Sequence, residues 1–120
     1  MLGFIHERLA QTVILFAFAL GAWAAWNFFR KQGVSASYWG ALVIGEGLML
    51  GQGVLGLALV LSGARPADLL HFLYGALVAL GLPGVYVYSH GRTTRTENAL
   101  YALVAFSIFG LALRAVTTGR

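Results

Sequence analysis

Four long apolar runs, separated by short polar turns, constrain this chain more than any other feature. They cover about residues 9–30, 37–62, 66–89 and 96–116. Each is close to the roughly 20 residues that an α-helix needs to cross about 30 Å of hydrocarbon. Strands of membrane β-barrels are about half as long and alternate in polarity. We therefore predict an all-α, polytopic membrane protein with four transmembrane helices.

Composition agrees with a lipid environment and with a single domain over residues 1–120. Of the 120 residues, 59% are hydrophobic and 10% are charged, whereas soluble domains carry about a quarter charged residues. A soluble chain this short could not bury so much apolar surface. The net charge of +4 comes from residues at the ends of the apolar runs, where they meet lipid headgroups. The bilayer, and not nucleic acid, is the expected partner.

Short connections make sequential helices antiparallel neighbours, so we predict an up-down bundle with both termini on one side. That side, called side A, carries His6, Arg8, Arg65, Asp68, His71, Arg114 and Arg120. The opposite side, side B, carries Arg30, Lys31, His90, Arg92, Arg95 and Glu97.

Orientation follows from where the basic residues lie. Each side holds four Lys or Arg residues, but all four of side B lie in short loops, including Arg30 and Arg92. The positive-inside rule therefore favours side B as the cytoplasmic side of a plasma membrane or bacterial-type inner membrane. Aromatic residues also gather toward side B, where they are typical of a headgroup-level belt: Trp23, Trp26, Tyr38, Trp39, Tyr86, Tyr88 and Tyr101.

Three local signals refine the helices. Thr94 followed by Glu97 has the spacing of a capping box at the start of the fourth helix. Pro83 predicts a kink in the third helix. Gly47 and Gly51 form a G-x-x-x-G pair in a glycine-rich second helix, which favours close packing and predicts that this helix is central to the bundle.

Glu46 is the most conspicuous residue, because it lies within a turn or two of the middle of the second helix. A charged carboxylate there costs several kcal/mol, so an intramembrane acid is by default a functional hypothesis. Contact with a quinone headgroup, proton relay and cation binding are all chemically reasonable. A hydrogen-bonded or protonated Glu that holds helices together is the structural alternative.

His6 and His71 are the candidate cofactor ligands. Antiparallel helices bring both to one level on side A, and two imidazoles in a four-helix bundle can bind haem iron. Arg65 and Arg114 lie on the same side and can pair with haem propionates. The alternative is that these His residues are simply solvated among the lipid headgroups. His90 lies at the other end and cannot join them.

Several classes of chemistry are not indicated. With no Cys, thiolate metal sites and covalent haem attachment are excluded. The sequence has no P-loop, no G-x-S-x-G and no H-E-x-x-H motif, so an enzyme is not favoured.

The outline, a short four-helix bundle with interfacial His residues and a buried Glu, is similar in shape to small haem-bearing membrane anchors of respiratory complexes. The leading hypothesis is a cytochrome-like or accessory subunit of an electron-transfer complex, binding haem b or quinone. One alternative is a structural or assembly subunit without a cofactor, and another is a small oligomeric transporter or channel. A homo-oligomer or a larger complex is expected in each case.

Overall fold

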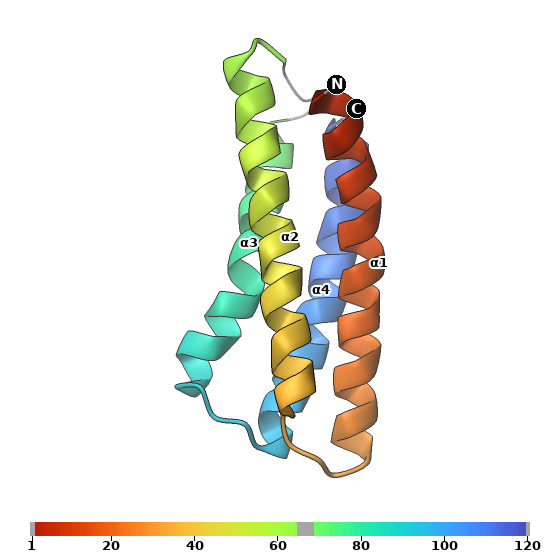
Figure 1. Cartoon of the computed structure of the whole chain (residues 1–120), viewed down its shortest axis with the longest axis vertical. Helices are drawn as coiled ribbons and strands as arrows, with labels where there is room; N and C mark the ends of the chain where they lie inside the picture. The colour runs from red at the N-terminus through yellow and green to blue at the C-terminus, as the bar shows by residue number, and fades with distance from the viewer. Residues whose placement is uncertain (1, 65–68, 120) are drawn as a thin grey trace.

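Four α-helices make up this computed structural model, which describes residues 2–64 and 69–119. They are α1 (Leu2–Phe29), α2 (Ala36–Leu61), α3 (Leu70–Ser89) and α4 (Arg95–Gly119). In Figure 1 the two chain ends lie together at one end of the bundle, and the turns after α1 and after α3 lie at the opposite end. The first end holds the described residues of side A, which include His6, His71 and Arg114, and the second holds those of side B.

The lengths and apolar character of the helices suit a bilayer. They contain 28, 26, 20 and 25 residues, or about 42, 39, 30 and 38 Å at about 1.5 Å per residue. All four are long and apolar enough to cross a membrane. Large aliphatic and aromatic side chains cover the outer surface, among them Leu15, Val54 and Val87, which are 71%, 66% and 71% exposed. Such a surface is suited to lipid contact.

The start of α1 differs from the boundary expected from the apolar run. α1 begins at Leu2, so its first turns include His6, Glu7 and Arg8. An apolar run ends where charges begin, but a helix continues past that point because its backbone still satisfies its own hydrogen bonds. α3 begins at Leu70, and the expected start near residue 66 lies outside the described residues.

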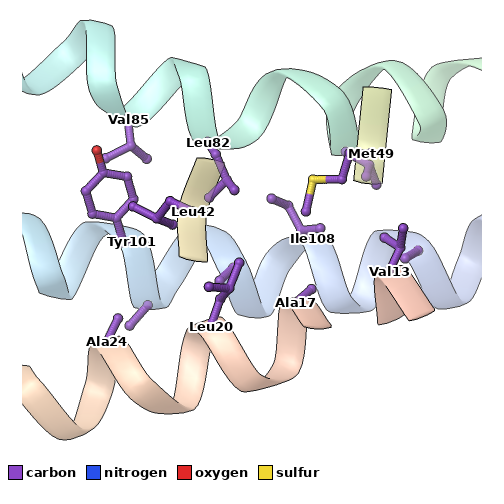
Figure 2. Packing of buried hydrophobic residues seen from close by; sticks show 14 of the residues in the cluster. Val13, Ala17, Leu20, Ala24, Leu42, Met49, Leu82, Val85, Tyr101 and Ile108 are labelled. Carbon is purple, nitrogen blue, oxygen red and sulfur yellow. The ribbon is translucent and has the colours of Figure 1, made fainter. Parts of the chain in front are cut away.

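The core is built mainly between α1 and α4. Its buried positions recur every three or four residues: Val13, Ala17, Leu20 and Ala24 on α1, and Tyr101, Ala105, Ile108 and Ala112 on α4. Figure 2 shows side chains of this cluster meeting between the helices. The alanines are small enough to let the two backbones approach closely, and α1 and α4 pack more extensively than any other pair.

The second helix is not central, contrary to the expectation from its glycines. Only 11% of the most apolar stretch of α2 is buried, compared with 28% for α1. A Cβ built on Gly47 or Gly51 would meet nothing within 4 Å. These glycines point away from the bundle, whereas Gly45 packs against Phe16 of α1. A side chain at either position of the G-x-x-x-G pair would therefore point into open space among the described residues.

The seam between α2 and α3 is the most loosely packed contact in the bundle. Pro83 lies inside α3, and the last turns of α3 slant away from α2 (Figure 1). Two aromatic side chains span the widened part, with the ring centroids of Trp39 and Tyr86 5.3 Å apart.

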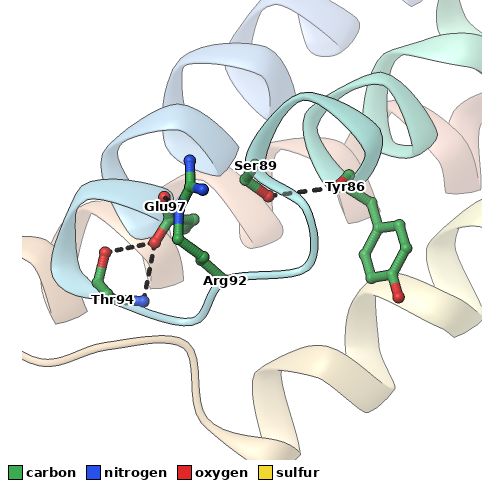
Figure 3. A network of polar contacts seen from close by, with 5 residues as sticks. All are labelled: Tyr86, Ser89, Arg92, Thr94 and Glu97. Carbon is green, nitrogen blue, oxygen red and sulfur yellow. Dashed lines mark hydrogen bonds and ion pairs between the residues drawn. The ribbon is translucent and has the colours of Figure 1, made fainter.

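At side B the turn after α1 and the turn before α4 are joined by hydrogen bonding. The Glu97 carboxylate accepts a hydrogen bond from the Thr94 backbone N–H at 2.9 Å, which confirms one of the two bonds of the capping box at the start of α4. It also contacts the Thr94 hydroxyl and lies 3.7 Å from Nε of Arg92 (Figure 3). The N–H of Val34 donates to the carbonyl of Thr93 at 2.8 Å. The turn after α1 is thereby fastened to the turn before α4.

Candidate functional site

The imidazoles of His6 and His71 meet at side A, with ring centroids 6.2 Å apart and ring planes at 70°. His6 lies in the first turns of α1 and His71 is the second residue of α3. The early start of α1 is essential to this arrangement, because it places His6 on a helix at the level where α3 begins. The structure thus brings together the two His residues named from the sequence.

The His71 ring is held by the last turns of α4. Its Nδ1 lies 2.7 Å from the backbone oxygen of Ala115. A carbonyl oxygen only accepts hydrogen bonds, so Nδ1 carries the proton and donates it. In a neutral imidazole this arrangement makes Nε2 the acceptor nitrogen of the ring.

The His6 turn is held by α2. The side-chain Nε2 of Gln52 donates to the backbone oxygen of His6 at 2.7 Å. One turn further along α2, Gly56 lies against the His6 ring, and a Cβ there would come within 3.2 Å of Cε1. The lack of a side chain at Gly56 is what gives the imidazole its space. Each of the four helices therefore contributes to the cluster.

Two polar atoms of this cluster are buried without a hydrogen-bond partner among the described residues. They are Nδ1 of His6 and the side-chain oxygen Oε1 of Gln52. A buried polar atom left unpaired typically costs about 1–3 kcal/mol. The cluster therefore carries unused hydrogen-bonding or metal-binding capacity at its centre.

These residues offer too few ligands for a metal ion that has no other ligands of its own. Structural and catalytic zinc sites take three or four protein ligands. Within residues 2–64 and 69–119, no three His, Asp or Glu side chains come together in a possible metal-binding group. A metal that is already bound by most of its ligands, within a larger cofactor, would need only two more ligands from the protein, and the two imidazoles could supply them.

The remaining residues named from the sequence lie apart from the His pair or are not described. Arg114 is exposed on α4, one residue before the Ala115 that holds His71. Arg65 lies outside the described residues. His90 is exposed at side B, where it caps α3 with a left-handed backbone, φ 54°.

Glu46 is a separate feature of α2. Both of its carboxylate oxygens are buried, and neither has a hydrogen-bond partner in the described part of the chain. It precedes Gln52 by six residues, or about 9 Å along the helix. The structure does not bring it into contact with the His pair, but places it one to two turns deeper in the bundle.

The aromatic belt expected at side B is only partly an outer belt. Tyr38 is fully buried and Tyr101 is 2% exposed. The Tyr38 hydroxyl donates to the carbonyl of Leu20 at 2.9 Å, and its ring contacts those of Trp23 and Tyr101. These two tyrosines fasten helices together instead of facing headgroups.

The sequence reading missed Gln52, Gly56 and Ala115 as parts of the His cluster. Gln52 and Gly56 are four residues apart, so they share one face of α2, and this spacing was the available signal. Ala115 contributes only a backbone oxygen, for which residue type gives no signal.

Two surface pockets lie away from the His pair. One, of about 380 Å³, is at side B and is lined by Val34, Ser35, Ala36, Trp39, Tyr86, Gly91 and Thr93. The other, of about 350 Å³, is on the outer side of α3 and α4 and is lined by Leu77, Leu80, Gly81, Gly84, Val85, Tyr88, Leu100 and Val104.

The sequence matches no protein-family model, and neither a curated protein nor a solved structure matches it significantly.

Proposed function

We propose that this chain is an integral membrane protein of four antiparallel, up-down helices that binds haem b between His6 and His71. It would serve as a cytochrome-like or accessory subunit of a membrane electron-transfer complex. The observation that carries the proposal is the 6.2 Å separation of the two imidazole centroids, contributed by α1 and α3.

This separation suits axial ligation of one iron. Two imidazoles on opposite sides of one metal have ring centroids about 6.3 Å apart when each metal–nitrogen bond is about 2.0 Å. The 70° angle between the ring planes is compatible with ligation, because each ring can turn about its bond to the metal. The observed centroid separation therefore matches the distance that two imidazole ligands of one iron require.

The ligand count favours haem over a free ion. Haem supplies four nitrogen ligands of its own, so the protein needs to contribute only the axial positions. Two imidazoles meet that need, whereas a bare ion would require further side chains. Attachment would be non-covalent, since the sequence has no Cys, and this indicates a b-type haem.

The surrounding residues support the ligand roles. The hydrogen bond from His71 Nδ1 to Ala115 fixes the ring and makes its other nitrogen a better ligand. Nδ1 of His6 is buried and unpartnered among the described residues, so this nitrogen could bind a ligand. Arg114 of α4 would pair with a haem propionate, and so would Arg65, which lies in the sequence between α2 and α3. Bound haem would supply one-electron transfer.

Room for the macrocycle must come from the helices around the rings. Gly56 leaves no side chain on the α2 face beside His6, and this favours insertion from the α2 side at side A.

Membrane placement follows from the same residues. With both termini on side A, the basic turns containing Arg30 and Arg92 favour side B as cytoplasmic, in a plasma or bacterial inner membrane. A homo-oligomer or a larger electron-transfer complex is the expected partner.

An absorption spectrum of protein purified in mild detergent, after expression with ample haem, tests the proposal. Wild type should show a Soret band with about one haem per chain, and His6→Ala or His71→Ala should remove it. His90→Asn is the matched control, because His90 is exposed at the opposite end and Asn tolerates its left-handed backbone. A wild-type protein without the band, or a band that survives both Ala substitutions, would count against haem binding here.

One observation favours a second candidate, a structural or assembly subunit without a cofactor. Gly47 and Gly51 face away from the bundle with no neighbour within 4 Å of a built Cβ. Small residues of this kind allow close contact between membrane helices. This candidate predicts stable co-purification with another membrane protein and loss of that association in Gly47→Leu.

A further inference from the structure

The buried carboxyl group of Glu46 has no role in the haem proposal. Glu46 lies about 15 Å along α2 from its first residue, Ala36, and thus near the middle of a span about 30 Å deep. Both oxygens are buried without a hydrogen-bond partner among the described residues. A polar group at such depth without a partner is costly, which makes a missing ligand the first explanation to consider.

Helical spacing shows which way Glu46 faces. Seven residues are close to two full turns, so Glu46 lies on the same side of α2 as Trp39. Trp39 contacts Tyr86 of α3, with ring centroids 5.3 Å apart. Glu46 is therefore on the side of α2 that faces α3.

The same spacing identifies what lies opposite. α2 and α3 run in opposite directions (Figure 1), so the residue level with Glu46 is Ala79, seven before Tyr86. Ala79 is small. Its carbonyl also lacks its usual helical donor, because Pro83, four residues later, has no N–H. A carboxyl group and a backbone carbonyl without its helical donor thus lie at one level of the seam.

The seam is also open toward lipid on the side A side of this level, about 10 Å from Glu46 at Gly53 and about 6 Å from Ala79 at Gly75. A Cβ built on Gly53 of α2 or on Gly75 of α3 would meet nothing within 4 Å, and both glycines are exposed. The rings of Trp39 and Tyr86 bound the seam toward side B. A flat molecule could therefore reach Glu46 from the bilayer without passing through water.

We propose that the α2–α3 seam binds the headgroup of a quinone or quinol, with Glu46 and the Ala79 carbonyl as its hydrogen-bonding groups. A neutral carboxyl donates to a quinone carbonyl, and both Glu46 and the Ala79 carbonyl accept from a quinol hydroxyl. This site is distinct from the His pair and rests only on the chain crossing the membrane. It lies about 9 Å along α2 from Gln52, which holds His6.

Other occupants fit less well. A cation at this depth would need several oxygen ligands, and no cluster of three acidic or His side chains exists in residues 2–64 and 69–119. A proton relay needs a hydrogen-bonded chain, and Glu46 has no bonded neighbour in the described structure. A phospholipid keeps its charged headgroup at the interface, whereas the quinone ring is uncharged and can lie deep in hydrocarbon.

Binding of decylubiquinone to the protein in phosphatidylcholine nanodiscs tests the proposal, with empty nanodiscs as the reference. Wild type should show one saturable site. Glu46→Leu should weaken it about three- to tenfold through loss of a hydrogen bond, and Ala79→Leu should weaken it at least as much by filling the seam. Glu46→Gln keeps a donor and an acceptor and should stay within about threefold of wild type. Ser107→Leu, an exposed polar position on α4, should bind as wild type.

Failure of this site and failure of haem binding are separable. Decylubiquinone binding should persist in His71→Ala, whatever the absorption spectrum shows. Three results would each overturn the proposal. They are no saturable binding by wild type, binding by Glu46→Leu and Ala79→Leu as tight as that of wild type, and competition by Na⁺. Size-exclusion profiles and helix content identify any variant that fails to fold, and the remaining substitution then decides.

Discussion

Two nearby glycines of α2 should respond in opposite ways to the same substitution. Gly45→Ala adds a Cβ that would lie 2.9 Å from Cε1 of Phe16 and 3.0 Å from Cδ1 of Leu20. Gly47→Ala adds a Cβ with nothing within 4 Å. The first change crowds the α1–α2 contact, and the second alters only the helix and its outer surface.

The magnitudes follow from two effects. Replacing Gly by Ala inside a helix stabilises it by about 0.5–1 kcal/mol, because Gly loses more backbone freedom on folding. Overpacking a core typically costs about 1–3 kcal/mol. For Gly45→Ala the crowding should win, lowering the free energy of unfolding by about 1–2 kcal/mol. For Gly47→Ala only the helix gain remains, so stability should rise by up to about 1 kcal/mol.

Titration of bicelle-embedded protein with sodium dodecyl sulfate, followed by helix content, measures both values against wild type. The two variants should differ by about 2 kcal/mol. Equal shifts for the two would refute the assignment of Gly45 to a packed face and Gly47 to an open one. A large loss in Gly47→Ala that grows weaker on dilution would mean that a second chain covers this face.

The side B contacts yield three further expectations, each measurable by the same titration. Gly33→Ala should cost about 2–4 kcal/mol, because its methyl group would overlap the Thr93 carbonyl oxygen and displace the hydrogen bond there; an unchanged midpoint would show that the turns are not fastened. Tyr38→Phe should cost about 0.5–1.5 kcal/mol through loss of the bond to the Leu20 carbonyl, and a stabilised variant would contradict this. Glu97→Ala should cost about 1–2 kcal/mol and speed amide exchange in the first turn of α4; unaltered exchange would exclude the cap.

The elements that sequence predicted well are those governed by local chemistry. Apolar length is sufficient to predict a helix long enough to cross a membrane, because a single segment can satisfy its own backbone in lipid only as a helix. The bond between Thr94 and Glu97 follows from spacing alone. The meeting of His6 and His71 also follows from connectivity, since both belong to ends of helices on one side.

What sequence could not supply was the direction in which each helix face points. Gly47 and Gly51 satisfied a packing motif, yet they face outward, because nothing in an all-apolar helix distinguishes a lipid-facing stripe from a core stripe. Tyr38 was assigned to the headgroup belt but lies inside the bundle. The contribution of Ala115 was hidden for a different reason, because it acts through its backbone.

The most extensive contact in the bundle joins its first and last helices, and this determines when the fold can be completed. During synthesis α1 is made long before α4 exists, so the stripe from Val13 to Ala24 must spend that interval without its partner helix. Hydrogen bonds that cross 66 and 67 residues, from Asn98 to Gln32 and from Arg95 to Phe28, form only afterwards. Assembly is thus completed by the carboxyl-terminal segment, and a chain that stops before Arg95 would leave its largest intramolecular interface unmade.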